Sequence, residues 1–410
     1  MIVQPDLKLG LFKLNCGDQR RVFIEGRVNG WNLHSLYREF VDYPPEGYQF
    51  ITPEGSLINQ TRFYPINRKI ISCSSTKFFY DCVRPKAYYL SLSAFSPKKI
   101  NADLVYVSQH VVNYNQPWVV DLEHAGALAA YGRTSLIRKT VEKAFRSPWC
   151  KKIMPWTHMA KKSLEASFDC TDLHDKIEVV NLAVRPKNFK KKYCEKNVRL
   201  IFVGTANPSN IQESFDLKGG RETLQAFKIL KKNYPDLELV IRSYLPDQFK
   251  TVCKCLNGVR VIDNLITAEE LSNEFRLADI FLFPGHNTPG MVILDAMSYE
   301  LPVVATDVWA NRELVNNGRT GLLIRGSSKV RYFDDNYIPI WGEPTFMKQI
   351  QRPDDEMVRE LVEKTSTLIE NKSLRKKLGK AGRHEIEKGK FSLERRNNKL
   401  KTIFEEAVNS

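Results

Sequence analysis

One stretch of about 45 residues constrains the fold of this chain most. An apolar run at residues 280–283 is followed by a polar loop at 284–290, a segment of helical period at 291–299 and a second apolar run at 301–306. A strand, a loop, a helix and a second strand form a βαβ unit, which requires parallel strands and a right-handed crossover. Ligands of such sheets bind beyond the carboxyl ends of the strands. The loop and the start of the next helix therefore predict a crevice whose free N–H groups suit an anion such as a diphosphate.

The same stretch contains an ordered series of short motifs: Pro284, Asn287-Thr288-Pro289-Gly290, Asp295-Ala296-Met297, Leu301-Pro302-Val303-Val304-Ala305-Thr306, Glu313-Leu314-Val315 and Thr320-Gly321-Leu322-Leu323. This series resembles the signature of the retaining glycosyltransferases of the GT-B fold, above all family 4. Their signature reads approximately P-S-x-x-E-G-F-G-x-x-x-x-E-A-M, then G-x-P-V-V-A-T, E-(L/I)-V and T-G-L-L. The chain departs from the pattern at three positions. Asn287 replaces the first glutamate, the shorter Asp295 replaces the second, and Glu300 replaces the glycine before the proline.

The resemblance implies an α/β protein in which two Rossmann-like domains face each other across a cleft. We expect an N-terminal acceptor domain, an interdomain linker, a nucleotide-sugar domain, and a C-terminal helix that crosses back to the first domain. The expected boundaries are 1–185, 186–197, 198–390 and 391–410, respectively. The length of 410 residues independently favours two domains.

Composition indicates a globular protein, with 42% hydrophobic and 27% charged residues. We expect no transmembrane helix and no secretory signal. The eight cysteines form no disulfide or zinc pattern, which favours reduced thiols in the cytoplasm. The net charge of +15 suits nucleic acid, an anionic membrane or a polyphosphate ligand. No nucleic-acid-binding motif accompanies it, so we expect no nucleic acid partner.

The hydrophobic pattern predicts further elements on both sides of the linker. Short strands are expected at 9–14, 49–52, 103–108, 118–122, 151–156, 176–180, 199–203, 237–241 and 259–262. Helices are expected at 31–40, 135–145, 159–166, 218–230, 269–277, 354–371, 374–388 and 393–408. Residues 326–353 form an aromatic, turn-rich insertion. The segment at 26–30 is the nearest match to the glycine-rich loop that family members have after their first strand.

Five positions in the second domain match residues that bind the donor in the family. The resemblance implies that Lys218 pairs with the donor diphosphate and that Asn287 contacts the donor sugar. It also implies that the N–H groups of Gly290 and Met291 face the diphosphate and that Asp295 binds the ribose hydroxyls. Each position has an alternative role: Lys218 as a solvated lysine, Asn287 as a turn residue, and Asp295 as an acid that stabilises the helix dipole.

In the first domain, His124 follows an apolar run, where many family members have a histidine near the transferred sugar. Its imidazole can donate to or accept from a sugar hydroxyl, or it is simply a loop histidine. Glu123 is a rival residue for activating the acceptor, and His286 is a further candidate. The family has an arginine after the first strand of its second domain, where this chain has Thr205, so Arg221 and Arg242 are candidate replacements.

The sequence therefore predicts a metal-independent, retaining glycosyltransferase that needs no cofactor beyond its UDP- or GDP-linked donor. We expect a glycan or lipid-linked acceptor. Nine lysines and arginines crowd between residues 133 and 162 together with Trp149 and Trp156. Such a surface predicts peripheral contact with the inner face of a membrane, although solvated helix faces would also explain it. The alternative function is a degenerate GT-B protein that binds a sugar nucleotide or glycan without transferring it.

Overall fold

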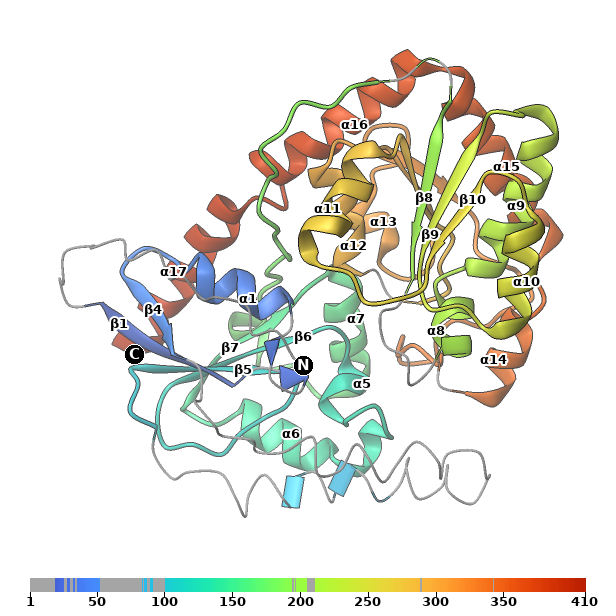
Figure 1. Ribbon diagram of the computed structural model, residues 1–410. Helices are drawn as coiled ribbons and strands as arrows, with labels where there is room; N and C mark the ends of the chain where they lie inside the picture. Colours follow the sequence, from blue (N-terminus) through green and yellow to red (C-terminus); the bar gives the residue numbers. More distant parts are fainter. Residues whose placement is uncertain are drawn as a thin grey trace, which may run out of the picture.

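The computed structural model describes residues 19–25, 28–29, 32–33, 35–51, 83, 85–86, 89–90, 100–193, 195, 197–204, 211–287, 290–341 and 343–410. The strand expected at 9–14 lies outside the described residues, as does most of the candidate glycine-rich loop at 26–30. The described residues form two α/β domains, each built on its own parallel sheet (Figure 1).

The first sheet is parallel throughout and has the strand order β4-β1-β5-β6-β7. Its strands are β1 (Arg20–Glu25), β4 (Tyr48–Ile51), β5 (Leu104–Ser108), β6 (Trp118–Leu122) and β7 (Cys150–Pro155). Apolar side chains of α1 (Ser35–Asp42) pack on one face, and those of α6 (Arg138–Phe145) and α7 (His158–Ser167) pack on the other. Two short helices, α5 (Ala125–Leu128) and η1 (Thr134–Leu136), follow β6, and a small hairpin pairs β2 (Val28–Asn29) with β3 (Asn32–Leu33).

The second sheet is also parallel and has the order β10-β9-β8-β11-β12-β13. Its strands are β8 (Arg199–Val203), β9 (Glu238–Arg242), β10 (Val259–Ile262), β11 (Ile280–Phe283), β12 (Val303–Thr306) and β13 (Gly321–Ile324). Helices α9 (Gly220–Asn233) and α15 (Asp355–Glu370) pack on one face. Helices α11 (Ala268–Leu277), α12 (Met291–Ser298) and α16 (Lys372–Glu387) pack on the other. Shorter helices complete the domain: α8 (Ile211–Leu217), α10 (Asp247–Cys255), α13 (Asn311–Leu314) and α14 (Pro344–Ile350).

The strand order of the second sheet predicts where a ligand would bind. The chain builds outward from β8 through β9 to β10, and then returns to the other side of β8 with β11. The connections that leave β8 and β11 therefore diverge to opposite faces, which opens a crevice at the carboxyl ends of these two strands. The turn at Lys218 follows β8 through α8, and the loop at Pro284 follows β11 directly.

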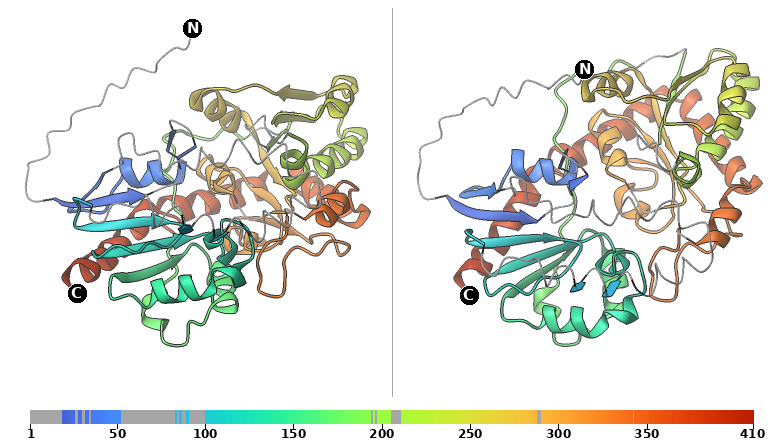
Figure 2. Two further views of the ribbon diagram at one scale, coloured as in Figure 1. Left: turned by 90° about the horizontal axis from the view of Figure 1, so that it is seen from below. Right: turned by 60° about the horizontal axis from the view of Figure 1, so that its bottom comes forward.

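The last helix joins the two domains. Helix α17 (Leu393–Asn409) follows α16 of the second domain and packs with Leu400, Phe404 and neighbouring apolar residues on the face of the first sheet that α1 covers (Figure 2). Arg396 of α17 donates to the carbonyl oxygens of Glu39 and Tyr43. The predicted return of the C-terminal helix to the first domain is confirmed.

The βαβ unit predicted from residues 280–306 is confirmed as β11, α12 and β12. Thr267 caps the N-terminus of α11: its side chain accepts from the N–H of Glu270, and the Glu270 side chain accepts from the N–H of Thr267. The strand expected at 176–180 is wrong. Ile177 forms one isolated bridge with Ile153, and Lys176 ends a turn, η2 (His174–Lys176), so this segment follows the edge of β7 without becoming a strand.

Candidate active site

The loop after β11 is tied to the turn that precedes α9. The N–H of His286 donates to the carbonyl of Leu217 at 2.8 Å, and the Thr306 hydroxyl donates to the carbonyl of Gly285 at 2.6 Å. Gly219 has φ +81°, and a Cβ at this position would collide with the carbonyl of Pro284. Only glycine combines this conformation with this close approach at little cost. The two loops at the sheet's switch point therefore behave as one structural unit.

Lys218 lies where these two loops meet. Its Nζ is 5.3 Å from the centre of the Phe283 ring and 3.5 Å from the position that a Cβ on Gly290 would take. When the amide oxygen of Asn287 faces it, Lys218 Nζ donates to Oδ1 at 3.1 Å, and Asn287 Nδ2 donates to the Leu217 carbonyl at 3.2 Å. Burial lowers the pKa of Lys218 to about 8, and the negative charge of Glu123 acts in the opposite direction. Lys218, Asn287 and Gly290, predicted separately from the motif, thus lie together.

The ammonium lies beside the N-terminus of α12. Gly290 is the N-cap residue and has no side chain to accept from the first N–H groups, and Met291 is the first helical residue. The first turn of a helix leaves such N–H groups without intrahelical partners and carries a partial positive charge. An anion placed there would contact both the helix N-terminus and Lys218.

Asp295 lies one turn further along α12, and its side chain is partly buried. Burial raises its pKa to about 6, while the positive charge of Lys187 opposes this shift and the negative charge of Glu39 reinforces it. Glu39 belongs to α1 of the first domain, and Lys187 belongs to the segment between the two sheets. The carboxylate therefore lies on the side of α12 that faces the first domain.

The first domain contributes the loop after β6. His124 is 1% exposed, and its ring packs edge-on against Tyr131 at 5.6 Å, Trp309 at 6.1 Å and Trp341 at 5.7 Å. Both tryptophans belong to the second domain, so His124 lies at the domain interface. Glu123 lines a small cavity between the domains together with Trp156, Thr157, Leu182, Trp309, Leu314 and Phe391.

Residues 197–335 match the family model described as "Glycosyl transferases group 1". The second domain is therefore similar to the group 1 glycosyltransferases. This match confirms the resemblance inferred from the motif series, and it covers the loops around Lys218 and Asn287.

Known proteins extend the comparison to the whole fold. The D-inositol 3-phosphate glycosyltransferase of Arthrobacter sp. (strain FB24) is 32% identical over 127 residues, which are 29% of this chain and 30% of that protein. The chain thus spans under a third of the length of this curated relative. A glycosyltransferase from Rickettsia africae ESF-5 superposes with a TM-score of 0.57 at 15% identity and covers 96% of this chain and 100% of its own. Anabaena Alr3699/HepE, solved in complex with UDP and glucose, gives 0.55 at 11% identity and covers 94% and 99%. These structures confirm the two-domain GT-B fold.

Two buried side chains, His286 and Glu222, meet the partly buried Tyr332 beside the loop that follows β11, and they were not predicted as a unit. His286, considered above as a sugar-binding residue, is 3% exposed. Its Nε2 lies 3.0 Å from Glu222 Oε1, and its Nδ1 lies 3.3 Å from the Tyr332 hydroxyl. His286 therefore anchors the loop to α9 and to the 326–353 insertion. Only the presence of a histidine and a glutamate at otherwise apolar positions signals this pair in the sequence.

Glu313, one of the residues of the motif series, links the second domain to the first. Its two carboxylate oxygens accept from the N–H groups of His158 and Met159, each at 2.8 Å. These N–H groups open α7 of the first domain, where the helix dipole favours a negative charge. Nearby, Lys162 of α7 stacks on Tyr337 of the insertion at 3.9 Å. Both contacts join the first domain to the second.

The two candidate arginines have different environments. Arg221 donates from Nε to Asp216 at 2.7 Å and from Nη2 at 3.2 Å, and its guanidinium stacks on Phe249 at 4.8 Å. The charge of Arg221 is therefore paired with that of Asp216 within the second domain. Arg242 is the last residue of β9, at the carboxyl edge of the sheet, and is 7% exposed.

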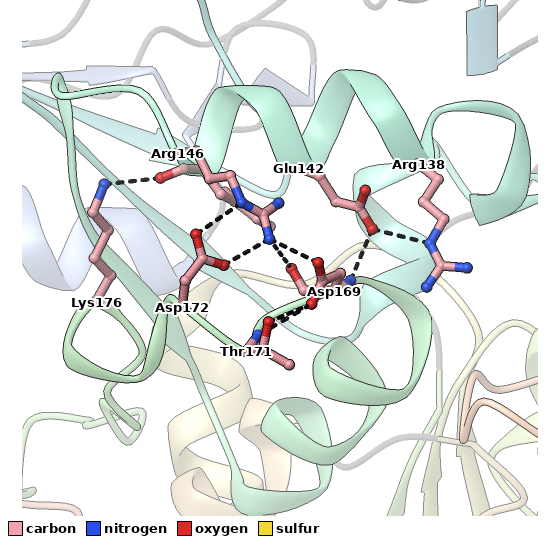
Figure 3. Close-up of polar contacts among 8 residues, drawn as sticks. Arg138, Glu142, Arg146, Asp169, Thr171, Asp172 and Lys176 are labelled. Atoms are coloured by element: carbon pink, nitrogen blue, oxygen red, sulfur yellow. Dashed lines mark hydrogen bonds and ion pairs between the residues drawn. The ribbon is translucent and has the colours of Figure 1, made fainter.

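The basic segment of the first domain is largely neutralised by its own neighbours (Figure 3). Arg146 pairs with Asp169 at 2.9 Å and Asp172 at 2.6 Å, and Arg138 pairs with Glu142. Trp156, expected at a membrane interface, instead donates from Nε1 to the buried Asp121 at 3.0 Å. The predicted patch is smaller than expected for this reason, and membrane contact stays a prediction.

Two negative findings apply to the part of the chain that the structure describes. It contains no helix long and apolar enough to cross a membrane. It also contains no group of three or more histidine, cysteine, aspartate or glutamate side chains placed to hold a metal ion.

Proposed function

We propose that the chain is a retaining glycosyltransferase that moves a sugar from a UDP- or GDP-linked donor to a glycan or lipid-linked acceptor. One observation carries the proposal: the Lys218 ammonium, the Asn287 amide and the uncapped N-terminus of α12 converge at the switch point of the second domain. A diphosphate fits this set because it presents negative oxygens to both a cation and free N–H groups.

The same set supports a role in the chemical step. The bond from the sugar to the diphosphate breaks during transfer, so negative charge develops on the departing oxygen. A preorganised ammonium and a helix N-terminus stabilise that charge most when they are already in place and partly shielded from water. We propose that Lys218 and α12 supply this stabilisation without a metal ion. Asn287 would hold Lys218 in place and contact the sugar.

Asp295 would orient the nucleoside. An ionised carboxylate accepts from two adjacent hydroxyls at once, and Asp295 lies about one helical turn, roughly 6 Å along the axis, from Met291, the first residue of α12. This spacing suits a ribose next to a diphosphate that binds at the N-terminus of α12.

The acceptor would enter from the first domain. Glu123 and His124 lie at the domain interface, and Trp156 lines the cavity between the domains. We propose that Glu123 activates the acceptor hydroxyl, because its charge already influences Lys218 across the cleft. His124 would shape the sugar site through its packing against Trp309 and Trp341. The acceptor oxygen would bond to the anomeric carbon on the face from which the nucleoside diphosphate departs, and its proton would pass to Glu123, so that the anomeric configuration would be retained.

A donor panel tests the proposal. The purified chain would be incubated with UDP-glucose, UDP-galactose, UDP-N-acetylglucosamine and GDP-mannose, and released nucleoside diphosphate would be measured, with and without EDTA. We expect slow release from at least one donor, unchanged by EDTA and at least tenfold slower in Lys218→Gln. Binding without release would favour the non-transferring alternative, and no binding of any donor would refute both.

A further inference from the structure

Arg242 is a buried cation at the edge of the sheet where the donor is proposed to bind. It ends β9, pairs in register with Val203 of β8, and its carbonyl accepts from the N–H of Gly204 at 2.9 Å. It is 7% exposed. The strand thus places a guanidinium at the carboxyl end of the sheet, next to the strand that borders the switch point.

The guanidinium has no anion to balance it within the described residues. None of their carboxylates lies within ion-pair distance, and Nε has no hydrogen-bond acceptor among them. Burial lowers the pKa of Arg242. Within the same described residues, Arg375 and Arg396 also leave one nitrogen each without an acceptor, but their other nitrogens donate to carbonyls: those of Leu368 and Ile369 for Arg375, and two beside α1 for Arg396. A buried charge without partners is costly to the folded state and is kept where it serves a function.

The side chain lies on the donor-binding face of the sheet. Leu239 and Ile241 pack with α9 and α15, whereas Val240 packs in the opposite core with Val203 and Phe283. Because side chains alternate along a strand, Arg242 shares the face of Val240. Phe283 lies two strands away, about 10 Å at the observed strand order, and the ammonium of Lys218 lies over its ring. The two cations therefore flank the carboxyl end of β8 from opposite sides.

We propose that Arg242 is the second cation that binds the diphosphate of the nucleotide donor. This inference rests on the proposed function and names a binding residue for it. It accounts for the missing arginine after β8, where the chain has Thr205, because the neighbouring strand supplies a guanidinium instead. Arg221, the other candidate, is paired with Asp216. A guanidinium suits the task because its planar donors match two phosphate oxygens at once.

The test compares Arg242→Gln with Arg375→Gln, a matched buried arginine whose charge acts on Asp279, at the opposite end of β11 from the Pro284 loop. Isothermal titration calorimetry would measure binding of UDP, GDP, UMP and GMP, and thermal melts would be recorded without ligand. We expect Arg242→Gln to weaken the preferred nucleoside diphosphate about 10- to 100-fold and the matching monophosphate less. Its melting temperature should stay the same or rise, because an unpaired buried charge is removed. Arg242→Lys should recover part of the affinity.

Arg375→Gln should show the reverse: a lower melting temperature, because the carbonyls of Leu368 and Ile369 lose their donor, with nucleotide affinity within about twofold of wild type. Unchanged diphosphate affinity in Arg242→Gln would overturn the inference and leave the proposed function standing. A lower melting temperature with unchanged affinity would assign Arg242 a purely structural role and overturn it as well. If the wild-type protein binds neither UDP nor GDP, the proposed function itself fails, and the inference fails with it.

Discussion

The pH dependence of nucleotide binding follows from the environment of Lys218. Burial lowers the pKa of its ammonium to about 8, and a bound diphosphate stabilises the protonated form and raises that pKa again. Below pH 8 the ammonium is already present, so this group adds no pH dependence to the affinity. Above pH 8 binding must take up a proton, and the dissociation constant rises by up to tenfold per pH unit. Between pH 7.5 and 9.5 the affinity should fall by roughly 25-fold, whereas a lysine with an ordinary pKa near 10.4 would give almost no change.

Calorimetry can measure both the affinity and the proton. Titrations of UDP or GDP at pH 8.5 in two buffers with different ionisation enthalpies should report the uptake of about 0.8 proton per ligand. The range above pH 7.5 avoids the second ionisation of the terminal phosphate, whose pKa is about 6. Lys218→Arg is the control, because an arginine stays charged throughout, and its affinity should be flat from pH 7.5 to 9.5. A flat wild-type profile, or the same decline in Lys218→Arg, would refute this account of the site.

Three substitutions test the rest of the architecture. Asp295→Asn should weaken the preferred nucleoside diphosphate about tenfold and should abolish its preference over the 2′-deoxy analogue in competition titrations; a preserved preference would remove Asp295 from the ribose site. Gly219→Ala should lower the free energy of unfolding by at least about 1 to 2 kcal/mol in urea titrations. The loss should exceed that of Gly318→Ala, because both glycines have positive φ but only a Cβ at Gly219 would collide with the Pro284 carbonyl. Equal losses in the two variants would contradict the close contact. Glu313→Ala removes the acceptor that joins α13 to α7. It should therefore lower the free energy of unfolding by about 1 to 3 kcal/mol and increase the radius of gyration in small-angle scattering. An unchanged radius would show that other contacts hold the domains together.

The helices and strands of the second domain could be predicted where the hydrophobic pattern of a segment agrees with its place in the tertiary structure. Residues 280–306 combine an apolar run, a glycine loop and helical periodicity, and they form β11, α12 and β12 with nearly the expected ends. The segment 176–180 has the same apolar alternation, yet it lies at the sheet edge beside β7 and forms one bridge. The periodicity of apolar residues does not show whether a segment will pair with a second strand, so the strand predicted at 176–180 was wrong.

The candidate donor-binding residues Lys218 and Asn287 could be predicted from the sequence, whereas the ionic partners of Glu313 and Arg146 could not. Lys218 and Asn287 occupy motif positions, and the structure brings their side chains to within 3.1 Å. Glu313 and the first turn of α7 are 154 and 155 residues apart, and their contact depends on how two complete domains pack. Arg146 likewise seemed free to bind a membrane until the fold placed Asp169 and Asp172 around it. Ionic partners distant in sequence are fixed by tertiary structure and have no local signature.

Two of the departures from the family pattern, at Asn287 and at Thr205 with Arg242 as its proposed replacement, act in the same electrostatic direction. A glutamate at position 287 would place a carboxylate beside Lys218 and pair its ammonium before any donor arrives; Asn287 orients the ammonium through its amide oxygen and leaves the charge in place. Arg242 likewise keeps a buried guanidinium without a carboxylate among the described residues. Opposite charges attract more strongly where burial reduces the effective dielectric constant, so both cations would gain most of their stabilisation from the incoming diphosphate. If Lys218 binds the diphosphate as proposed, the replacement of a sugar-contacting glutamate by Asn287 would strengthen the interaction of the ammonium with the leaving group, and the negative charge of Glu123 in the first domain also favours the charged form of Lys218.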